Sequence, residues 1–425
     1  MASLSVRPPF FGHQVVRAAF TLAVFAWGVG FYGLPVYLNA VVIRTGWPLS
    51  LVSSAVTVHC LAGVVVISRL PTLHRRYGVG PVATCGAAVT GLGVIGWALA
   101  QAPWQLFVAA IVSGAGWVTM AAVAVNAIIV PWFERDRPLA LGKAYNGASI
   151  GGVIFSPLWV VLNQAIGFPQ AATLIGLAMV LVVALLSARV FSKRPDSLGQ
   201  GVDGDLPAPA NSMPIVADAR RPPALAGALW RNRRFQTLAA GMAIGSFAQT
   251  GMIAHLLTLL VPVLGARPAG LVVGFATGCG MAGRYVAAVL LKHVSDRRLV
   301  AAVGYAIQLI GVALLMAAGA NSMLLILFGV ALFGSGIGNV TSMPPLIAQS
   351  EFARQDVPRV VASIVATAQA TYAFAPAAFA LVLAGTGARA GLPHIGEGTT
   401  RFFATIACTQ VVAIALFLLG RSAKH

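Results

Sequence analysis

A short glycine-containing sequence occurs twice in this chain. Residues 113–119 read SGAGWVT and residues 335–341 read SGIGNVT, an offset of 222 positions with two substitutions. The arginine pair at 75–76, in LHRRYGVG, corresponds at the same offset to the pair at 297–298, in SDRRLVAAVG. Two matches at one offset predict an internal repeat, so the chain is built from two halves of the same topology.

The composition places both halves in a membrane. Of the 425 residues, 58% are hydrophobic and 9% are charged, whereas a soluble domain has roughly 25% charged residues. Apolar runs of about 20 residues, the length that crosses a bilayer as a helix, recur along the chain. We therefore predict an all-α membrane protein with twelve transmembrane helices in two six-helix repeats. The predicted spans are 15–42, 49–69, 79–101, 104–130, 138–163, 169–191, 235–262, 268–291, 299–318, 322–348, 358–385 and 400–420.

One polar segment separates the two sets of six spans. Residues 193–234 are rich in Pro and Gly and carry most of the charge between spans 6 and 7. They define an N-terminal six-helix bundle at 1–192, a cytoplasmic linker at 193–234 and a C-terminal bundle at 235–425. Parallel six-helix repeats around a site near the middle of the bilayer are typical of secondary transporters.

The formal net charge of +18 could indicate a protein that binds nucleic acid. The distribution of the charged residues along the chain decides between this function and a membrane topology. With a cytoplasmic N-terminus, 22 of the 28 Lys and Arg fall on the cytoplasmic side of the predicted topology. This asymmetry follows the positive-inside rule. It predicts a multi-pass protein of the inner (plasma) membrane with both termini in the cytoplasm, and it argues against nucleic acid as a partner.

A lone arginine stands inside predicted span 8. Arg284, in GFATGCGMAGRYVAAVLLKH, lies about eight residues, or roughly 12 Å, from the cytoplasmic end of its span. An arginine at bilayer depth costs roughly 2.5 to 3.5 kcal/mol unless it has a partner or reaches water. All ten Asp and Glu can be placed outside the spans. A substrate anion is then the simplest counter-charge, with snorkelling of the side chain to water as the alternative.

Two motifs resemble those of a known family. The sequence LLKHVSDRRL looks like the loop motif of the major facilitator superfamily, with Asp296 and Arg297 as its acid and base; the matching loop of the first half keeps Arg76 but lacks the acid. WFERDRPLALGKAYNGASIGG, which contains Arg137, is similar to the span 4 to 5 signature of monocarboxylate transporters, which oxalate/formate antiporters partly share. The resemblance implies the major facilitator fold, a carboxylate-binding role for Arg284, and gating roles for these loop residues.

The differences from that family narrow the expected substrate. Span 1 lacks the lysine of animal monocarboxylate transporters, and Gly280 stands where their acid precedes the span 8 arginine. Span 11 lacks the lysine of oxalate/formate antiporters. Proton coupling through that acid is therefore not implied. A single buried guanidinium favours a singly charged anion, so we expect a small monocarboxylate as substrate.

Other polar residues in the spans either line a substrate cavity or join helices to each other by hydrogen bonds. Those at mid-depth are Tyr32, Gln249, Asn339 and Tyr372. His59 and His255 are candidates for proton coupling, because histidine titrates near neutral pH. His59 is also a candidate for contact with the substrate, and packing is the alternative for both histidines. Lys143, near the start of span 5, either reaches the cytoplasmic surface or belongs to the path of the anion.

Two rival functions remain to be weighed. A carrier of the same superfamily that exports hydrophobic drugs would have a structural Arg284. A membrane enzyme, such as an acyl transferase using His59 or His255, is disfavoured because no Ser/His/Asp or paired-carboxylate arrangement occurs. We expect no enzyme activity, cofactor or metal; the expected partners are a small organic anion, the lipid bilayer and protons.

Overall fold

The computed structural model describes residues 9–205, 229–294, 296–319, 322–353, 356–384, 395 and 399–421, and within them the side chains at 292, 339–342, 345 and 358 are not described. In these ranges the regular secondary structure is helical. Eleven of the described segments are long and apolar enough to cross a membrane, and the shorter apolar helix Met323–Ile337 supplies the remaining span. The predicted twelve-span all-α fold is confirmed.

The first half of the chain supplies six spans, two of which are interrupted. Spans 1 and 4 each consist of two helices, and a short helix on the surface follows span 2. The helices are α1 (Gly12–Gly30), α2 (Leu34–Thr45), α3 (Leu49–Ile67), α4 (Leu70–Tyr77), α5 (Val79–Leu99), α6 (Pro103–Trp117), α7 (Ala122–Ile129), α8 (Arg137–Ile166) and α9 (Phe168–Leu186), with the π-helical turn η1 (Ser187–Phe191).

The second half has the same order of spans, and its spans 10 and 11 are interrupted. Between the halves, the described part of the predicted linker forms two short turns, η2 (Asp196–Leu198) and η3 (Val202–Gly204), while residues 206–228 lie outside the described ranges. The helices are α11 (Arg233–Leu264), α12 (Ala266–His293), α13 (Arg297–Ala318), α14 (Met323–Ile337), α15 (Asn339–Glu351), α16 (Val357–Tyr372), α17 (Ala375–Ala384) and α18 (Thr400–Leu419).

The repeated sequence coincides with two of the interruptions. In the first half α6 ends at Trp117, and in the second half α14 ends at Ile337, both inside the repeated seven residues. Glycine is among the poorest helix formers because it loses the most backbone entropy, so these glycine-rich segments are weak points of a helix. The repeat therefore marks a structural feature, the break in spans 4 and 10.

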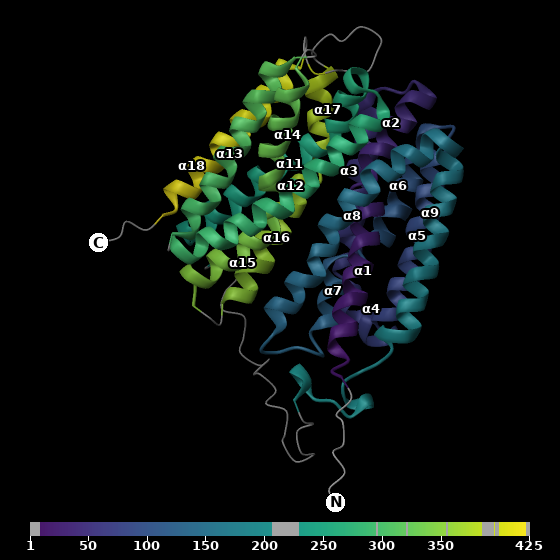
Figure 1. The fold of residues 1–425 in the computed structure, drawn as a ribbon, viewed down its shortest axis with the longest axis vertical. Helices are drawn as coiled ribbons and strands as arrows, with labels where there is room; N and C mark the ends of the chain where they lie inside the picture. Colours follow the sequence, from purple (N-terminus) through teal and green to yellow (C-terminus); the bar gives the residue numbers. More distant parts are fainter. Residues whose placement is uncertain are drawn as a thin grey trace, which may run out of the picture.

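The two halves lie side by side as separate groups of helices. Figure 1 shows α1 to α9 in purple to teal on one side and α11 to α18 in teal to yellow on the other, diverging toward the lower end of the view, where α1 begins. Contacts between the halves are made by α2 with α11, α3 with α16 and α17, and α8 with α12. The pair α8 and α12 is the one that brings Arg284 against the other half.

Close packing of α8 against α1 depends on two glycines. A Cβ added at Gly147 would lie 2.2 Å from the carbonyl oxygen of Phe20, and one at Gly151 would lie 2.4 Å from that of Val24. The spacing of these two glycines is the G-x-x-x-G pattern that lets membrane helices approach each other closely. This glycine face of α8 turns toward α1, which leaves other faces of the helix for α12.

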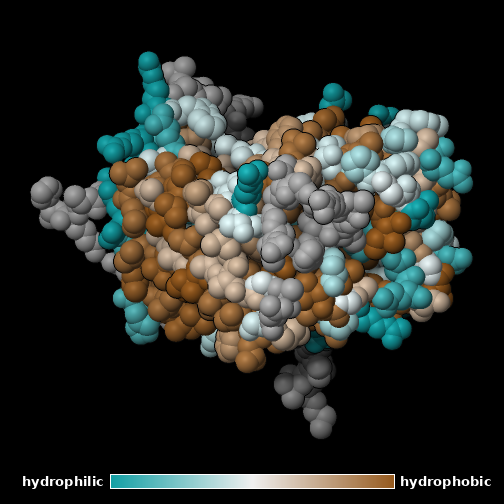
Figure 2. Space-filling model, turned by 90° about the horizontal axis from the view of Figure 1, so that it is seen from above, coloured by the Kyte–Doolittle hydropathy of each residue, from teal (hydrophilic) through white to brown (hydrophobic). Residues whose placement is uncertain are grey.

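Large apolar side chains cover much of the molecular surface. Val65, Leu92, Leu177 and Leu381 are each at least 65% exposed. Figure 2, which looks onto the end that is uppermost in Figure 1, shows broad hydrophobic areas between scattered hydrophilic groups. Apolar surface on this scale is unfavourable in water and is expected of helices that face lipid.

Candidate functional site

Arg284 connects the two halves of the protein. It lies in α12 and is half-buried. Its Nε donates a hydrogen bond to the carbonyl oxygen of Gly338 at 3.0 Å. Its Nη1 and Nη2 donate to Oδ1 of Asn146 and Oγ of Ser149, each at 3.1 Å. The guanidinium thus joins the break between α14 and α15, in its own half, to α8 in the other half.

The break in span 10 is shaped to receive this side chain. A Cβ added at Gly338 would lie 2.1 Å from the carbonyl oxygen of Gly280 and 3.2 Å from Nε of Arg284. Gly338 is also the residue after the last turn of α14, where helix carbonyl groups lack partners within the helix. Glycine at 338 therefore lets α12 approach and place its arginine there.

The partners in α8 lie on one face of that helix. Asn146 and Ser149 are three residues apart, which puts them one turn apart on the same side. Lys143 lies a further turn toward the start of α8 and is exposed. This face of α8 carries Lys143, Asn146 and Ser149 in order from the predicted cytoplasmic end inward, and its last two members contact Arg284.

Tyr32 is a predicted site residue that the structure brings close to this arrangement. It lies in the interruption between α1 and α2 and is 7% exposed. Its ring packs near Gly152 of α8, as does the methyl group of Thr277 in α12. The Tyr32 hydroxyl is near enough to Arg284 for the two side chains to interact electrostatically. Tyr32 and Thr277 therefore bound the site on the side of Ser149 away from Lys143.

The acceptors around Arg284 leave its charge without a carboxylate. Among the residues that the structure describes, the ion pairs are Arg298 with Glu351 and Arg421 with Asp296. Asn146, Ser149 and the Gly338 carbonyl satisfy hydrogen bonds but carry no net charge. An arginine in this setting is suited to hold an anion, because its planar fork binds a carboxylate through two parallel hydrogen bonds.

His59 lies inside the N-terminal bundle, away from these contacts. It is 1% exposed, and its ring stacks on Trp117 with centroids 5.5 Å apart. Nδ1 lies 2.8 Å from Oγ of Ser113, and Nε2 lies 3.0 Å from the carbonyl oxygen of Gly30. Both ring nitrogens are thus used within α1, α3 and α6, which is the packing alternative considered from the sequence.

His255 is buried in the C-terminal bundle. It is fully buried in α11, with its edge toward Phe402 of α18 and Nε2 2.9 Å from the carbonyl oxygen of Pro376 in α17. Among the described residues, Nδ1 has no hydrogen-bond partner. None of the hydrogen bonds of either histidine within the described part of the chain connects it to Arg284.

Gln249 belongs to a network of glutamines between helices. Its Nε2 donates to Oε1 of Gln308 at 2.9 Å, and Gln410 donates to the same oxygen at 3.4 Å. Gln308 in turn donates to the carbonyl oxygen of Phe333 at 2.9 Å. The network joins α11, α13, α14 and α18, so for Gln249 the structure shows the interhelical alternative.

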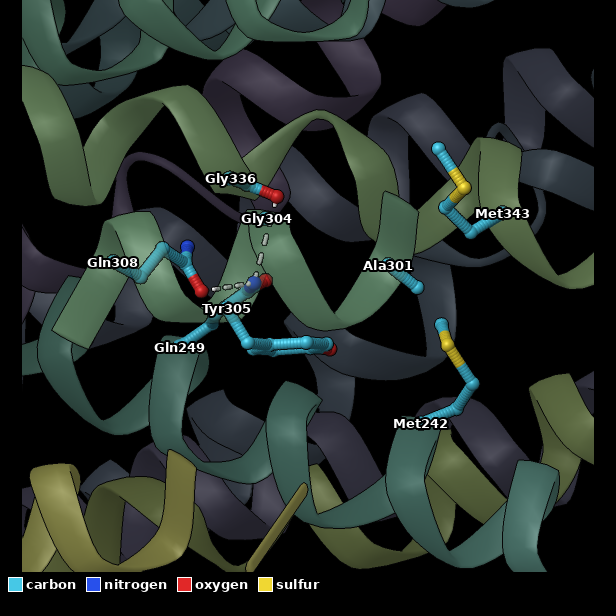
Figure 3. A pocket seen from close by; sticks show the side chains of 8 residues that line it. All are labelled: Met242, Gln249, Ala301, Gly304, Tyr305, Gln308, Gly336 and Met343. Carbon is cyan, nitrogen blue, oxygen red and sulfur yellow. Dashed lines mark hydrogen bonds between the residues drawn. The ribbon is translucent and has the colours of Figure 1, made fainter. Parts of the chain in front are cut away.

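This network borders a very small cavity. Figure 3 shows Gln249 and Gln308 turned toward each other on one side, with Met242 and Met343 on the other. The cavity offers about 10 Å³ to the centre of a water molecule, which is room for about one water. It is too small for an organic substrate.

The remaining predicted site residues are Tyr372, which lies near Cys60, and Asn339, whose side chain is not described. Tyr372 is half-buried at the end of α16, close enough to Cys60 of α3 for an electrostatic interaction, so it lies near the contact between the halves. Asn339 begins α15, but its side chain is outside the described part of the structure.

In the loop before α13, the acid and the base of the motif, Asp296 and Arg297, do not pair with each other but bond to other groups. Asp296 accepts a hydrogen bond from the backbone N–H of Leu299 at 3.1 Å, so it caps α13, and it pairs with Nε of Arg421 at 2.6 Å. Partial burial raises the pKa of Asp296, but the hydrogen bonds and the charge of Arg421 lower it by more. The pKa of Asp296 therefore lies below its usual 3.8. Arg297 donates to the carbonyl oxygen of Leu346.

The buried ion pair of this region belongs to Arg298, which the motif comparison did not select. Arg298 is 1% exposed and binds both carboxylate oxygens of Glu351 at 2.5 and 2.8 Å. It also donates to Thr237 and to the carbonyl oxygen of Arg234. The pair therefore fastens α13 to α15 and to the start of α11.

In the first half, Arg76 occupies the position that corresponds to the buried Arg298, and Arg137 lies at the start of α8. Arg76 is exposed and lies over the ring of Tyr77, 5.2 Å from its centroid. Arg137 begins α8, and its Nε donates to the carbonyl oxygen of Phe133 at 2.9 Å. Just before α8, the backbone N–H groups of residues 134 to 136 all donate to the carboxylate of Asp203 from the linker. Slight burial raises the pKa of Asp203, but these donors and the charge of Arg135 lower it overall.

Sequence reasoning missed Asn146, Ser149 and the Arg298–Glu351 pair. A signal existed for the first two, since both lie in the quoted segment AYNGASIGG one turn apart on a helix that was predicted correctly. For Arg298 the repeat offset gave its position but not its burial. The described residues contain no cluster of three His, Cys, Asp or Glu that could hold a metal.

The structure thus consists of two bundles of membrane-spanning helices, with an arginine that reaches from one bundle into the other. The family model of the Major Facilitator Superfamily matches residues 20–380. The chain therefore belongs to the major facilitator superfamily, as the loop motif implied.

Similar proteins agree on this family. Residues of the chain align at 29% identity with monocarboxylate transporter 11 of Mus musculus, over 40% of this chain and 35% of that protein. They align at 24% identity with MFS-type transporter 1 of Ophiocordyceps sp. (strain BCC 1869), over 68% of this chain and 59% of that protein. The chain thus spans less than two thirds of these curated relatives.

Solved structures show the same fold. The nucleoside transporter NupG superposes with a TM-score of 0.70 at 13% identity, over 97% of this chain and all of NupG. A bacterial homologue of the human lysosomal transporter Spinster gives a TM-score of 0.68 at 13% identity, over 97% of both chains. At this identity the similarity concerns the fold alone.

Proposed function

We propose that this protein transports a small organic monocarboxylate by alternating access, with the carboxylate bound at Arg284. We further propose that it resides in the plasma (inner) membrane with both termini on the cytoplasmic side, where the positive-inside rule places them. The observation that carries the proposal is the hydrogen bonding of Arg284, whose fork extends from the C-terminal half to α8 of the N-terminal half.

The charge around Arg284 favours a monoanion. One guanidinium is matched in charge by one carboxylate, and the described acceptors near it are neutral. Tyr32 and Thr277 both approach Gly152 next to the site and offer an apolar ring and a methyl group. A short apolar or aromatic substituent on the acid would pack there. The alignments with a transporter named for monocarboxylates, over part of the chain, agree with this substrate class.

Neither histidine supports proton coupling through a side chain next to the anion. His59 and His255 bond within their own bundles. We therefore propose that the protein exchanges anions or carries the proton on the substrate itself.

The test is uptake into proteoliposomes of labelled lactate, pyruvate, a longer monocarboxylate, oxalate and a hydrophobic drug. Arg284→Lys is expected to lower monocarboxylate uptake about 10- to 100-fold, because an ammonium cannot reproduce the two-pronged fork and charged hydrogen bonds contribute about 1.5 to 3 kcal/mol. Arg267→Lys is the matched control, since Arg267 lies on the same helix and bonds Gln164 at 2.9 Å.

The outcomes separate the candidate functions. Transport of the drug without the acids would indicate the efflux carrier. Uptake of acids by Arg284→Lys at the wild-type rate, at matched membrane expression, would contradict a carboxylate-binding role for Arg284.

A further inference from the structure

The side chains that hold Arg284 come from α8, and this bears on how the carrier cycles. We infer that Asn146 and Ser149 form a latch that occupies Arg284 when no anion is bound and gives way to the carboxylate of the substrate. The inference rests on the proposed function and adds a role for two residues that no motif identifies. It implies that the loaded carrier changes conformation faster than the unloaded one.

The latch residues and a substrate carboxylate would compete for the same nitrogens of Arg284. Asn146 and Ser149 accept from the two terminal nitrogens of Arg284, both at 3.1 Å. These nitrogens form the edge of the guanidinium that holds a carboxylate end-on. Since both acceptors belong to α8, an anion that lies between α8 and α12 competes with each of them.

The exchange of partners favours the anion. Hydrogen bonds between two charged groups are roughly twice as strong as those between neutral groups, and a carboxylate also compensates the charge of the arginine. The bond from Nε to Gly338 lies within the C-terminal half and can persist during this exchange. It keeps the guanidinium oriented while its terminal nitrogens change partners.

The latch restrains movement between the halves. Alternating access moves one half of the protein against the other around a fixed site. An unloaded carrier must first break the bonds from α12 to Asn146 and Ser149, whereas the substrate has already replaced them in a loaded carrier. Exchange of internal for external anion should therefore be faster than net transport.

The matched control is a second hydrogen bond between the same two helices. Gln164 of α8 accepts from Arg267 of α12 at 2.9 Å, more than three turns away from Ser149 and out of reach of an anion held by Arg284. Loaded and unloaded carriers must handle this bond alike. Gln164→Ala should therefore change net transport and exchange by the same factor.

The flux experiment compares Asn146→Ala, Ser149→Ala, the double variant, Gln164→Ala and wild type in proteoliposomes. Net efflux of labelled monocarboxylate into buffer and exchange against external monocarboxylate are measured at matched protein. We expect the double variant to raise net efflux about tenfold relative to exchange, as the loss of one to two hydrogen bonds to a charged group implies. An unchanged ratio in the double variant, or the same change of ratio in Gln164→Ala, would overturn the latch. A raised KM for exchange at an unchanged ratio would identify Asn146 and Ser149 as substrate ligands instead.

A second measurement does not depend on the substrate. Spin labels at Tyr77, at the end of α4, and at Gln349, near the end of α15, are both on exposed positions, with the four native cysteines replaced. In the protein without any anion, the double variant should shift the distribution of distances between the labels, and Asn146→Asp, which adds a carboxylate, should not. An unchanged distribution in the double variant would overturn the latch. If no monocarboxylate is transported, the proposed function fails while this readout still decides the latch.

Discussion

Equivalent helices of the two halves each carry a buried or half-buried polar residue, but the hydrogen-bond partners of the two residues lie in different places. α3 carries His59 and α12 carries Arg284, and each faces the interrupted span that contains the repeated sequence. The partners of His59, Ser113 and Gly30, lie in its own half. Two of the three partners of Arg284 lie in the other half.

The breaks themselves are satisfied in different ways. At the repeat offset, Gly338 corresponds to Gly116, whose carbonyl oxygen accepts from Oγ1 of Thr119 at 2.8 Å. Ala62 stands where the second half has Arg284. A polar group bonded within one bundle stabilises that bundle, whereas one bonded across the bundles changes partners when they move. We propose that the location of the partners, more than the residue type, separates polar groups that stabilise one bundle from those that act in transport.

The largest expected effect tests the same contrast in the loops. Arg298→Leu should reduce the free energy of unfolding by about 3 kcal/mol, because it removes both hydrogen bonds between the buried Arg298 and the Glu351 carboxylate, whose side chain is 18% exposed. Arg76→Leu, the equivalent change in the first half, should cost less than about 0.5 kcal/mol, since Arg76 is exposed. Thermal unfolding in detergent measures both. Equal losses would show that the halves do not differ in this respect.

His59→Phe separates stability from transport. The phenyl ring can keep the stacking on Trp117, but it cannot bond the Gly30 carbonyl, while Ser113 keeps its bonds to Trp97 and Ala110. We expect a cost of about 1 to 3 kcal/mol. We expect a lower melting temperature and an unchanged KM for the monocarboxylate. A KM that rises severalfold in protein of wild-type stability would move His59 into the substrate site.

Lys143→Gln tests whether the charge of Lys143 contributes to the path of the anion along α8. Removing this exposed charge one turn before Asn146 should lower uptake about two- to fivefold at low ionic strength, and the difference should vanish near 1 M salt, where charges are screened within about 3 Å. Arg69→Gln removes an exposed positive charge elsewhere and is the control. Equal effects of the two variants would reduce Lys143 to one of many surface charges.

The smallest effect concerns Asp296, which corresponds to His74 in the first half. Asp296→Asn should cost about 1 kcal/mol or less, because asparagine also caps helices but does not pair with Arg421. Since the pKa of Asp296 is lower in the folded state, its contribution is complete above the unfolded value of 3.8 and is lost as the pH falls through the folded value. Unfolding from pH 3 to 7 checks this: a difference between wild type and variant that grows below about pH 4 would contradict it.

The fold could be predicted from the sequence because its signals are visible in the order of residues along the chain. These signals are the length of the apolar runs, the asymmetry of the charged residues and the internal repeat. It was insufficient for the site because side-chain partners depend on how α8 meets α12. Arg284 could be found as an unpaired charge, and Gly147 and Gly151 as a close contact. Whether Gln249 and His59 bond within a bundle, or Arg298 finds Glu351, follows from packing between distant segments. Their residue types alone gave two alternatives.

The central claim is that Arg284 binds the carboxylate of the substrate, and a binding measurement with two ligands tests it most directly. Equilibrium binding of a labelled monocarboxylate and of its methyl ester would be compared in wild type and Arg284→Gln. We predict that the acid binds the wild type about 10- to 100-fold more tightly than the variant, since charged hydrogen bonds contribute about 1.5 to 3 kcal/mol, while the ester binds both proteins equally. Equal affinity of the acid for both proteins, or the same loss for the ester as for the acid, would contradict the account.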